Sequence, residues 1–432
     1  MAQRQPDRVV IINDRSAMVG GASNLAILSA KMFRQRGLNV TYFCGDHPGV
    51  DKPAPDTIGL AGKPLVNQGK LSAFSSGLYN AKAYTTLNDL IREQDTPSTI
   101  YHVHGWSKIL SPSIFRALSR VRQRTVLHAH DYFLACPNGG FTNYRTDRLC
   151  KLRPMSAQCL MNQCDKRGYQ QKLWRAARHL LREDFFSIRD MPANIVMVHE
   201  RMRSSFERSG INTEEITTIR NPAEPFFTVP HDPAEHRSFF FIGRLEPEKG
   251  FEEAARAARL ANVTLEVIGE GPGRAVLERD YPEVMIHGWQ SREGLRLLMQ
   301  NARAIVISSR VPEPFSLAAM EAVSSGIPVI MPDSALLSTE IAELGCGFAF
   351  SHGQPEALAE RMRTMAVDDR LVRTLAENCR EQAPALASSN ELWIDALLAL
   401  YRRVLDRADN RAERGILPNS SASAGYFATR RL

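Results

Sequence analysis

Two glutamates eight residues apart are the most informative pair of reactive side chains in this sequence. Glu313 and Glu321 lie in residues 308–332, where an apolar run leads into a proline-rich loop and then a helix that we expect to begin near Phe315 and to end before Gly326. Eight residues are about two helical turns, so both carboxylates can face one pocket and accept hydrogen bonds from hydroxyl groups. The helix start suits an anion. From the spacing alone a structural reading stays open, in which Glu313 caps the helix and Glu321 lies on the surface.

Two cations follow another apolar run. Residues 238–242 are strand-like, Arg244 comes directly after Gly243, and Lys249 and Gly250 precede a helical pattern. Two cations at a strand end can neutralise an anionic group that gains charge during a reaction, in place of a divalent metal. No Asp-x-Asp motif lies between apolar runs to bind a metal-nucleotide. A solvated surface position is the alternative for both cations.

Histidines and glycine-rich turns follow several other strand-like runs. His102 and His104 end one run, and His128 and His130 end another. A lone histidine is more often structural, but four at two strand ends favour a functional role for His130 and His104. The glycine turns follow the runs at 9–12 and 264–268, and glycines let a backbone approach a phosphate, although an ordinary tight turn explains a lone Gly-x-Gly equally well. The glycines in question are Gly20, Gly21, Gly269 and Gly271.

Apolar strand-like runs alternate with helix-length segments along the chain. We expect strands at 9–12, 40–44, 100–104, 126–129 and 195–199 in the first half, and at 216–219, 238–242, 264–268, 284–287, 304–308 and 328–331 in the second. Helical patterns include 23–36, 252–261, 291–300 and 317–325. This alternation predicts an α/β fold of two doubly wound, Rossmann-like domains that face a deep cleft, with ligands at the carboxyl ends of the strands.

A proline-rich stretch, residues 221–233, marks the expected boundary between the two domains. We therefore predict an N-terminal domain at 1–220 and a C-terminal domain at 221–388; the family resemblance described below implies that the first is the acceptor side and that the second binds the nucleotide sugar. An amphipathic pattern at 389–408 predicts a last helix that can cross back to the N-terminal domain. The composition of residues 409–432 predicts a disordered tail.

The segment with the two glutamates resembles retaining glycosyltransferases of family 4, which have the GT-B fold. Glu313-Pro314-Phe315-Ser316-Leu317 and Glu321-Ala322, followed by Gly326-Ile327-Pro328-Val329, match the family's Glu-Pro-Phe-Gly-Leu, Glu-Ala and Gly-x-Pro-Val, with Ser316 in place of a common glycine. The resemblance implies that Glu313 contacts hydroxyls of the donor sugar and that Glu321 holds the ribose of the nucleotide. It also implies that the backbone at Phe315, Ser316 and Leu317 meets the diphosphate.

Other segments extend this resemblance to most of the chain. Gly243-Arg244-Leu245 with Lys249-Gly250 is similar to the family's Gly-Arg-Leu-x-x-x-Lys-Gly motif, which implies that Arg244 and Lys249 hold the diphosphate. The turn with Gly269 and Gly271, and the loop with Gly20 and Gly21, resemble the family's phosphate-side turns. His130, in His130-Asp131, corresponds to a histidine that reaches the donor sugar, and His287 stands near the nucleobase pocket.

The implied activity is transfer of a hexose from a nucleotide diphosphate sugar to an acceptor hydroxyl, with retention at the anomeric carbon. The acceptor would be a saccharide or a lipid-linked saccharide of bacterial surface polysaccharide or glycolipid synthesis, and no cofactor would be required for catalysis. Two alternatives remain. The first is a nucleotide-sugar epimerase of the same fold, which should lack the Glu-x7-Glu segment. The second is a non-catalytic nucleotide-sugar-binding protein. The presence of all four charged residues argues against it: Arg244, Lys249, Glu313 and Glu321.

Charge and composition limit the partners. The chain has 432 residues, 44% of them hydrophobic, with no membrane-spanning run and no visible secretory signal, so a cytoplasmic protein is expected. Residues 1–220 hold 31 Lys+Arg against 18 Asp+Glu. Without a nucleic-acid-binding motif, we expect no nucleic acid partner. The pattern at 169–189 resembles a basic amphipathic helix, which predicts either packing on the N-terminal sheet or peripheral contact with an anionic inner membrane.

Four of the seven cysteines lie within an irregular insert, residues 132–168. A tetrathiolate zinc site or an iron–sulfur cluster could hold such an insert together. The spacing C-x13-C-x8-C-x4-C lacks the C-x2-C pairs of common zinc sites, so four independent thiols are the alternative. The candidate ligands are Cys136, Cys150, Cys159 and Cys164.

Overall fold

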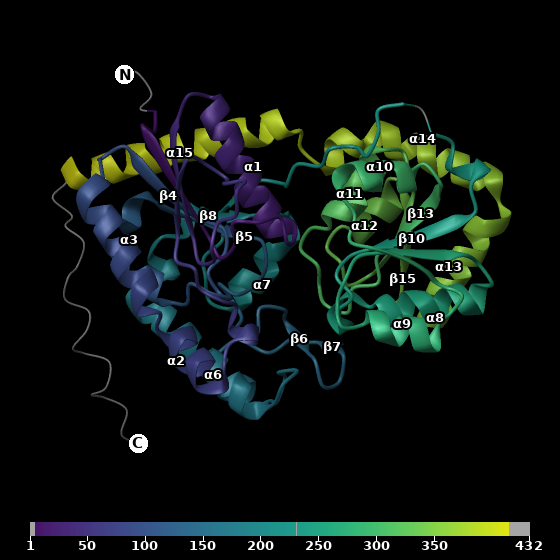
Figure 1. Cartoon of the computed structure of the whole chain (residues 1–432), viewed down its shortest axis with the longest axis horizontal. Coiled ribbons are helices and arrows are strands. Elements are labelled where there is room, and N and C mark those ends of the chain that lie inside the picture. Colours follow the sequence, from purple (N-terminus) through teal and green to yellow (C-terminus); the bar gives the residue numbers. More distant parts are fainter. Residues whose placement is uncertain (1–4, 230, 414–432) are drawn as a thin grey trace.

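The computed structural model describes residues 5–229 and 231–413, which form two α/β halves, each built on a parallel sheet. Figure 1 shows the halves side by side, with the last helix lying along the N-terminal one. The N-terminal sheet has the order β3-β2-β1-β4-β5-β8-β9. Its strands are β1 (Arg8–Asn13), β2 (Asn39–Cys44), β3 (Asp56–Gly59), β4 (Thr99–Val103), β5 (Thr125–Ala129), β8 (Ile195–Met197) and β9 (Thr217–Thr218).

The C-terminal sheet has the order β12-β11-β10-β13-β14-β15. Its strands are β10 (Ser238–Ile242), β11 (Leu265–Ile268), β12 (Met285–Gly288), β13 (Ala302–Val306), β14 (Val329–Pro332) and β15 (Gly347–Phe350). A short antiparallel hairpin, β6 (Thr142–Asn143) and β7 (Arg148–Leu149), lies apart from both sheets. The prediction of two doubly wound parallel sheets is confirmed.

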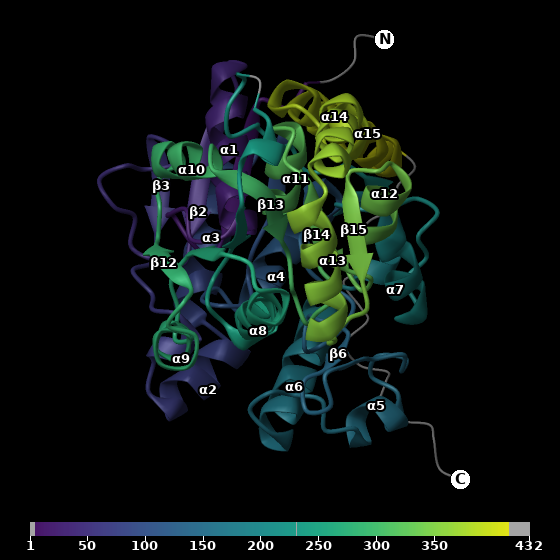
Figure 2. The same cartoon turned by 90° about the vertical axis from the view of Figure 1, so that its right-hand side faces the viewer.

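Helices cover the faces of both sheets, and Figure 2 shows those around the C-terminal sheet from the side. In the N-terminal half they are α1 (Gly21–Gln35), α2 (Lys70–Leu78), α3 (Ala81–Gln94), α4 (Ser113–Leu118), α5 (Ala157–Met161), α6 (Tyr169–Phe185) and α7 (Arg203–Arg208). After them come α8 (Phe251–Ala261), α9 (Arg274–Asp280), α10 (Arg292–Met299), α11 (Leu317–Ser324), α12 (Ser338–Glu343), α13 (Pro355–Val367), α14 (Asp369–Leu386) and α15 (Asn390–Glu413).

Successive residues of a strand point to opposite faces, and this alternation divides the core into layers. In β1, Val9 and Ile11 pack with α1 and α15, whereas Val10 and Ile12 pack with α3 and α4. In β10, Phe239 and Phe241 pack with α8 and α13, whereas Phe240 belongs to the cluster that includes α11 and α14. Strands buried on both faces read as continuous apolar runs, which is why the sequence revealed most of them.

Some expectations about the elements were wrong. Residues 216–219 were grouped with the second series of strands, but β9 pairs with β8 as an edge of the N-terminal sheet, which agrees with the expected N-terminal domain at 1–220. Strands β3 and β15 were also missed: β3 carries one large apolar side chain, and β15 is a four-residue segment that begins with Gly347. The expected disorder is wrong for Asp409–Glu413, which continue α15, and residues 414–432 lie outside the described part.

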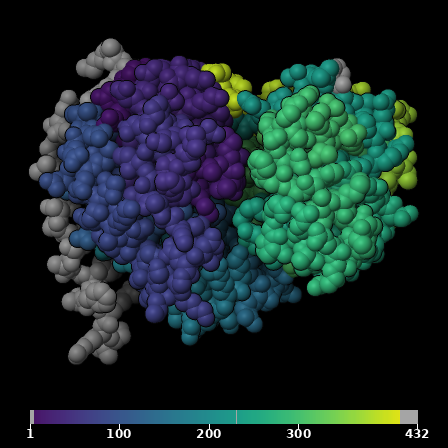
Figure 3. Space-filling view, in the orientation of Figure 1, coloured from purple at the N-terminus to yellow at the C-terminus, as the bar shows by residue number. Residues whose placement is uncertain are grey.

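Helix α15 packs against the N-terminal sheet rather than the C-terminal one. Trp393 and Tyr401 are fully buried there, and the Tyr401 ring lies 5.4 Å from the ring of Phe33 in α1. Two chain crossings therefore join the halves, and they lie side by side: Ala223 donates its backbone N–H to the Ser388 carbonyl at 3.1 Å. Figure 3 shows the halves facing each other across a groove.

Candidate functional site

Lys249 and Glu313 meet at the carboxyl ends of β10 and β13. Gly250 has φ 71°, and a side chain at this position would lie 1.8 Å from the Ser308 carbonyl oxygen, so glycine allows the loop after β10 to press against the end of β13. Lys249 Nζ lies 2.8 Å from Glu313 Oε1, and the Ser309 hydroxyl donates to the other carboxylate oxygen. Burial acts to raise the pKa of Glu313, but the Lys249 ammonium and the Ser309 bond outweigh it and lower the pKa. Glu313 is therefore ionised at neutral pH.

Arg244 stands at the rim of this pair. Its guanidinium lies 2.6 Å from the Glu246 carboxylate, and its side chain is 46% exposed. Exposed ion pairs contribute about 0–1 kcal/mol, so an anionic ligand can replace Glu246 as the partner at little cost. The structure thus places both predicted cations, Arg244 and Lys249, on the same loop after β10.

The start of α11 faces the first glycine loop of the N-terminal half. Ser316 caps this helix, because its hydroxyl accepts the Ala319 N–H, so the reading of Glu313 as the cap is wrong. A side chain added at Gly21 would lie 3.2 Å from Leu317 Cδ1, which places the N-terminus of α1 directly against that of α11. Gly20, with φ 148°, precedes α1. Two helix N-termini from different halves therefore converge, and both favour negative charge.

Gly269 and Gly271 have a packing role of their own. Their φ angles are 145° and 156°, and a side chain at Gly269 would lie 1.9 Å from the Gly243 carbonyl oxygen. The two glycines hold the turn after β11 against the turn that carries Arg244. This close approach explains the residue type without a ligand, so their contact with a nucleotide stays a prediction.

Arg292 is a site residue that the sequence analysis missed. Its Nη1 donates to Glu321 Oε1 at 2.6 Å, and its Nη2 donates to the carbonyls of Glu224 and Pro225 at 2.7 and 2.9 Å. Burial raises the pKa of Glu321, and Arg292 opposes this effect only in part. Arg292 and Glu321 are 29 residues apart in the sequence, so no local pattern predicts their contact. Glu321 is therefore not a free surface residue.

His287 pairs within its own sheet. Its Nε2 lies 2.7 Å from the Glu266 carboxylate, on the neighbouring strand β11. The adjacent Trp289 is 69% exposed. Both lie at the end of β12, on the same edge as the turn after β11, and the base contact expected for His287 stays a prediction.

The four histidines of the N-terminal half form one cluster. His104 Nδ1 lies 2.9 Å from His130 Nε2, and His102 Nε2 lies 3.2 Å from His128 Nδ1. His102 Nδ1 also lies 2.6 Å from the hydroxyl of Tyr401, on α15. Burial lowers the pKa of all four, that of His130 to about 3, so they are neutral at physiological pH. His130 therefore acts as a neutral hydrogen-bonding group.

Two of the four cysteines, Cys159 and Cys164, contact a buried lysine. Lys172 is buried, and its ammonium donates to Cys164 Sγ at 3.3 Å and to the carbonyls of Cys159 and Asn162. Within residues 5–229 and 231–413, two groups of three possible metal ligands have their ligand atoms within 4.8 Å of one another, and neither contains a cysteine. The sulfurs are not preassembled as ligands, and the metal stays a prediction.

Helix α6 has the reverse of the expected polarity. Lys172, Arg178 and Arg182 are buried, and the two arginines donate to the carbonyls of Ser107 and Leu134. Its leucines instead face outward: Leu173 is 45% and Leu180 57% exposed. Neighbouring α2 exposes Leu71 and Phe74, and Trp174 donates its indole N–H to the Phe74 carbonyl, so the two helices are joined. The prediction that the basic residues of this helix face an anionic surface is wrong, because they satisfy buried carbonyls.

Comparison with known proteins shows the fold of the chain and the family profile that part of it matches. The chain has the GT-B fold: it superposes on sucrose-phosphate synthase from Thermosynechococcus elongatus with a TM-score of 0.68 and 19% identity, covering 94% of this chain and all of the other. HepE of Anabaena, solved with UDP-glucose, gives a TM-score of 0.60 at 17% identity over 93% of this chain and 99% of the other. Residues 226–384 match the profile of the family described as glycosyl transferases group 1.

Two curated relatives match part of the chain. A GDP-mannose-dependent alpha-mannosyltransferase of Mycobacterium tuberculosis is 30% identical over 178 residues, which are 40% of this chain and 44% of that protein. The match thus spans less than half the length of the curated relatives it reaches. Among the described residues, no helix combines the length and apolar character that a bilayer crossing requires.

Proposed function

We propose that this chain is a retaining glycosyltransferase of family 4 that moves a hexose from a nucleotide diphosphate sugar to an acceptor hydroxyl. The observation that carries the proposal is the position of the Lys249–Glu313 pair: it lies one loop before α11, and the start of α11 faces the glycine loop before α1. Cations, two helix N-termini and an ionised carboxylate are thus gathered between the two halves. This is the combination that a sugar attached to a diphosphate requires.

In this proposal, donor binding replaces an internal ion pair. The diphosphate takes Lys249 and Arg244 as its cations and the backbone at Phe315–Leu317 as its hydrogen-bond donors. Glu313 then loses part of its pairing with Lys249, and its carboxylate accepts hydrogen bonds from the sugar hydroxyls. Since the pKa of Glu313 is lowered, it acts as an acceptor and not as an acid.

Glu321 takes the ribose hydroxyls, and His130 donates a hydrogen bond to the donor sugar from the N-terminal side. The two cations stabilise the charge on the departing diphosphate. Retention then follows from departure of the diphosphate and attack by the acceptor on the same face. This route needs no covalent intermediate with a carboxylate.

The donor and acceptor are the finer part of the proposal. GDP-mannose is the first donor to test, because the two curated relatives that match about 40% of this chain are described as GDP-mannose-dependent. For the acceptor we propose a lipid-linked saccharide of surface glycan synthesis, reached from the cytoplasmic face of the inner membrane. The support for membrane contact is the apolar surface of α2 and α6, formed by Leu71, Phe74, Leu173 and Leu180.

A panel of nucleotide sugars tests this function. Each donor is incubated with the enzyme, with and without saccharide acceptors, and released nucleotide is measured. We expect release with one donor, its increase by acceptor, and its loss in Lys249→Met and Glu313→Gln. Lys151→Met, which removes an exposed lysine far along the sequence from these loops, is the matched control. Binding without turnover of any donor would replace this function with that of a binding protein.

The stereochemistry and the main alternative are read from the same reactions. The anomeric configuration of the product, followed by NMR, distinguishes retention from inversion. An epimerase would convert the donor sugar without an acceptor and without forming a glycoside. For the cysteine insert, we keep the proposal of a structural zinc or iron–sulfur site; metal analysis of the wild type against Cys150→Ser tests it, and metal in neither protein would refute it.

A further inference from the structure

The ends of β4 and β5 hold three histidines that lack part of their expected partners. His102, His104 and His128 are 0%, 5% and 4% exposed, and each offers a ring nitrogen within 4.8 Å of the other two. The Nε2 atoms of His104 and His128 are buried without any hydrogen-bond partner. A buried polar atom left unpaired costs about 1–3 kcal/mol, so two such atoms side by side indicate a missing ligand.

We propose that His102, His104 and His128 bind a divalent transition metal ion of the zinc class. One ring nitrogen from each of the three histidines lies within 4.8 Å of those of the other two, so a single ion with Zn–N bonds of about 2.0–2.1 Å can be approached by all three. His104 brings its unpartnered Nε2. Neutral imidazole is a common ligand for this metal class.

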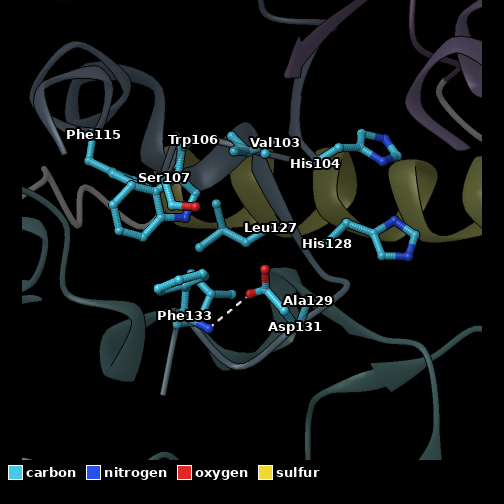
Figure 4. A pocket seen from close by; sticks show the side chains of 12 residues that line it. Val103, His104, Trp106, Ser107, Phe115, Leu127, His128, Ala129, Asp131 and Phe133 are labelled. Carbon is cyan, nitrogen blue, oxygen red and sulfur yellow. Dashed lines mark hydrogen bonds between the residues drawn. The ribbon is translucent and has the colours of Figure 1, made fainter. Parts of the chain in front are cut away.

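The imidazole rings of His104 and His128 extend to the same side of the strand ends. Figure 4 shows that these two side chains lie next to each other and extend the same way, away from Trp106 and Phe115, which line the neighbouring cavity of about 30 Å³. The three histidines would supply the three protein ligands that zinc takes beside a fourth, exchangeable one.

Tyr401 supplies the contact that metal-bound histidines usually need. A histidine that binds metal through Nε2 carries its proton on Nδ1 and donates it to a nearby oxygen. His102 Nδ1 lies 2.6 Å from the Tyr401 hydroxyl, which is held on α15. The metal would thus tie the last helix of the chain to the strand ends of the N-terminal sheet.

The second group of possible ligands lacks this character. His199, Glu200 and Glu340 also come together, but Arg220 bridges the two carboxylates at 2.8 and 2.7 Å. A cation already neutralises that group. Within the described part of the chain, no such cation pairs with His102, His104 and His128. Their neutral ring nitrogens can therefore accept a cation that binds from outside the cluster.

The metal would also orient His130. When His104 binds through Nε2, its Nδ1–H donates to His130 Nε2 at 2.9 Å, which leaves the proton of His130 on Nδ1. His130 is then a fixed donor on its other side. This consequence rests on the proposed function, whereas the metal site itself does not.

Metal binding to the untagged full chain tests the proposal without any sugar or nucleotide, so its failure is separable from that of glycosyl transfer. Protein stripped with chelator is titrated with zinc by calorimetry and with cobalt(II) by absorption. The background carries Cys136→Ser, Cys150→Ser, Cys159→Ser and Cys164→Ser, which removes thiolate ligands and their near-ultraviolet charge-transfer bands. We expect one metal ion per chain and visible cobalt bands in this background.

Variants of the cluster then locate the ion. His128→Asn should abolish binding, and Tyr401→Phe should weaken it about 10–100-fold. His199→Asn, which removes a buried histidine at the end of β8, should bind as well as its parent. Absence of cobalt bands in the cysteine-free protein, or undiminished binding in a folded His128→Asn variant, would overturn the proposal. If His128→Asn does not fold, the cobalt spectrum decides alone.

Discussion

Replacing Arg292 with alanine separates a role in nucleotide binding from a role in folding. Arg292 donates to Glu321 and to two carbonyls of the linker, Glu224 and Pro225. If Glu321 binds the ribose hydroxyls, Arg292 positions that carboxylate without touching the ligand. Its loss should weaken binding of ribonucleotides and leave binding of nucleotides without ribose hydroxyls unchanged.

The structure sets the magnitudes. A hydrogen bond to a charged group contributes about 1.5–3 kcal/mol, so Glu321→Ala should weaken binding by roughly 10–150-fold. Arg292 is 45% exposed and the side chain of Glu321 is 25% exposed, so their mutual attraction is worth about 0.2–1 kcal/mol. Arg292→Ala should therefore weaken binding up to roughly fivefold.

The assay is calorimetric binding of a nucleoside diphosphate and of its dideoxy analogue, which lacks both ribose hydroxyls. We expect Arg292→Ala and Glu321→Ala to reduce affinity for the first and not for the second. In the double variant the two effects should not add, because Arg292 acts through Glu321. Equal losses for both ligands would refute the reasoning, since they would show a general change in the fold of the pocket.

The remaining predictions concern pH, stability and the apolar surface. The pKa of Glu321 is raised, so nucleotide affinity should fall on acidification at a pH above the usual glutamate range. Glu321→Gln should remove this pH dependence. A wild-type affinity that does not change down to pH 4.5 would contradict the prediction. Arg303 is fully buried and donates to three carbonyls and to Asp369. Arg303→Met should lower the free energy of unfolding by about 3–5 kcal/mol, whereas exposed Arg256→Met should lower it by less than about 0.5 kcal/mol. Denaturant titrations measure both values. Gly269→Ala should lower the free energy of unfolding by at least about 2 kcal/mol. Gly49 has open space around it, so Gly49→Ala should leave the free energy of unfolding nearly unchanged. Leu173→Glu with Leu180→Glu should abolish binding to phospholipid vesicles and leave the melting temperature within a few degrees; vesicle binding retained in this variant would contradict the proposed membrane contact.

The fold could be predicted because its signals are local, and the site residues that we propose in the C-terminal half rest on local patterns as well. Apolar runs buried on both faces announce parallel strands, and the loop from Glu313 to Leu317 carries its own sequence pattern. The orientation of helix α6 could not be predicted in this way. The spacing of its apolar residues indicates an amphipathic helix, but it does not show that Arg178 and Arg182 point inward and donate to backbone carbonyls. Arg292 and Tyr401 were missed because their partners are far along the chain.

The contacts that sequence could not reveal are also those that join the parts of the molecule. Tyr401 connects the last helix to the histidines of β4 and β5, and Gly21 touches Leu317 across the groove. Arg292 holds the linker carbonyls and Glu321 with one guanidinium. Any ligand that engages Glu321 therefore acts on a side chain that is fixed to the crossing between the halves. If Glu321 binds the nucleotide, we expect nucleotide binding and the linker between the halves to be coupled through Arg292, and Arg292→Ala to remove this coupling.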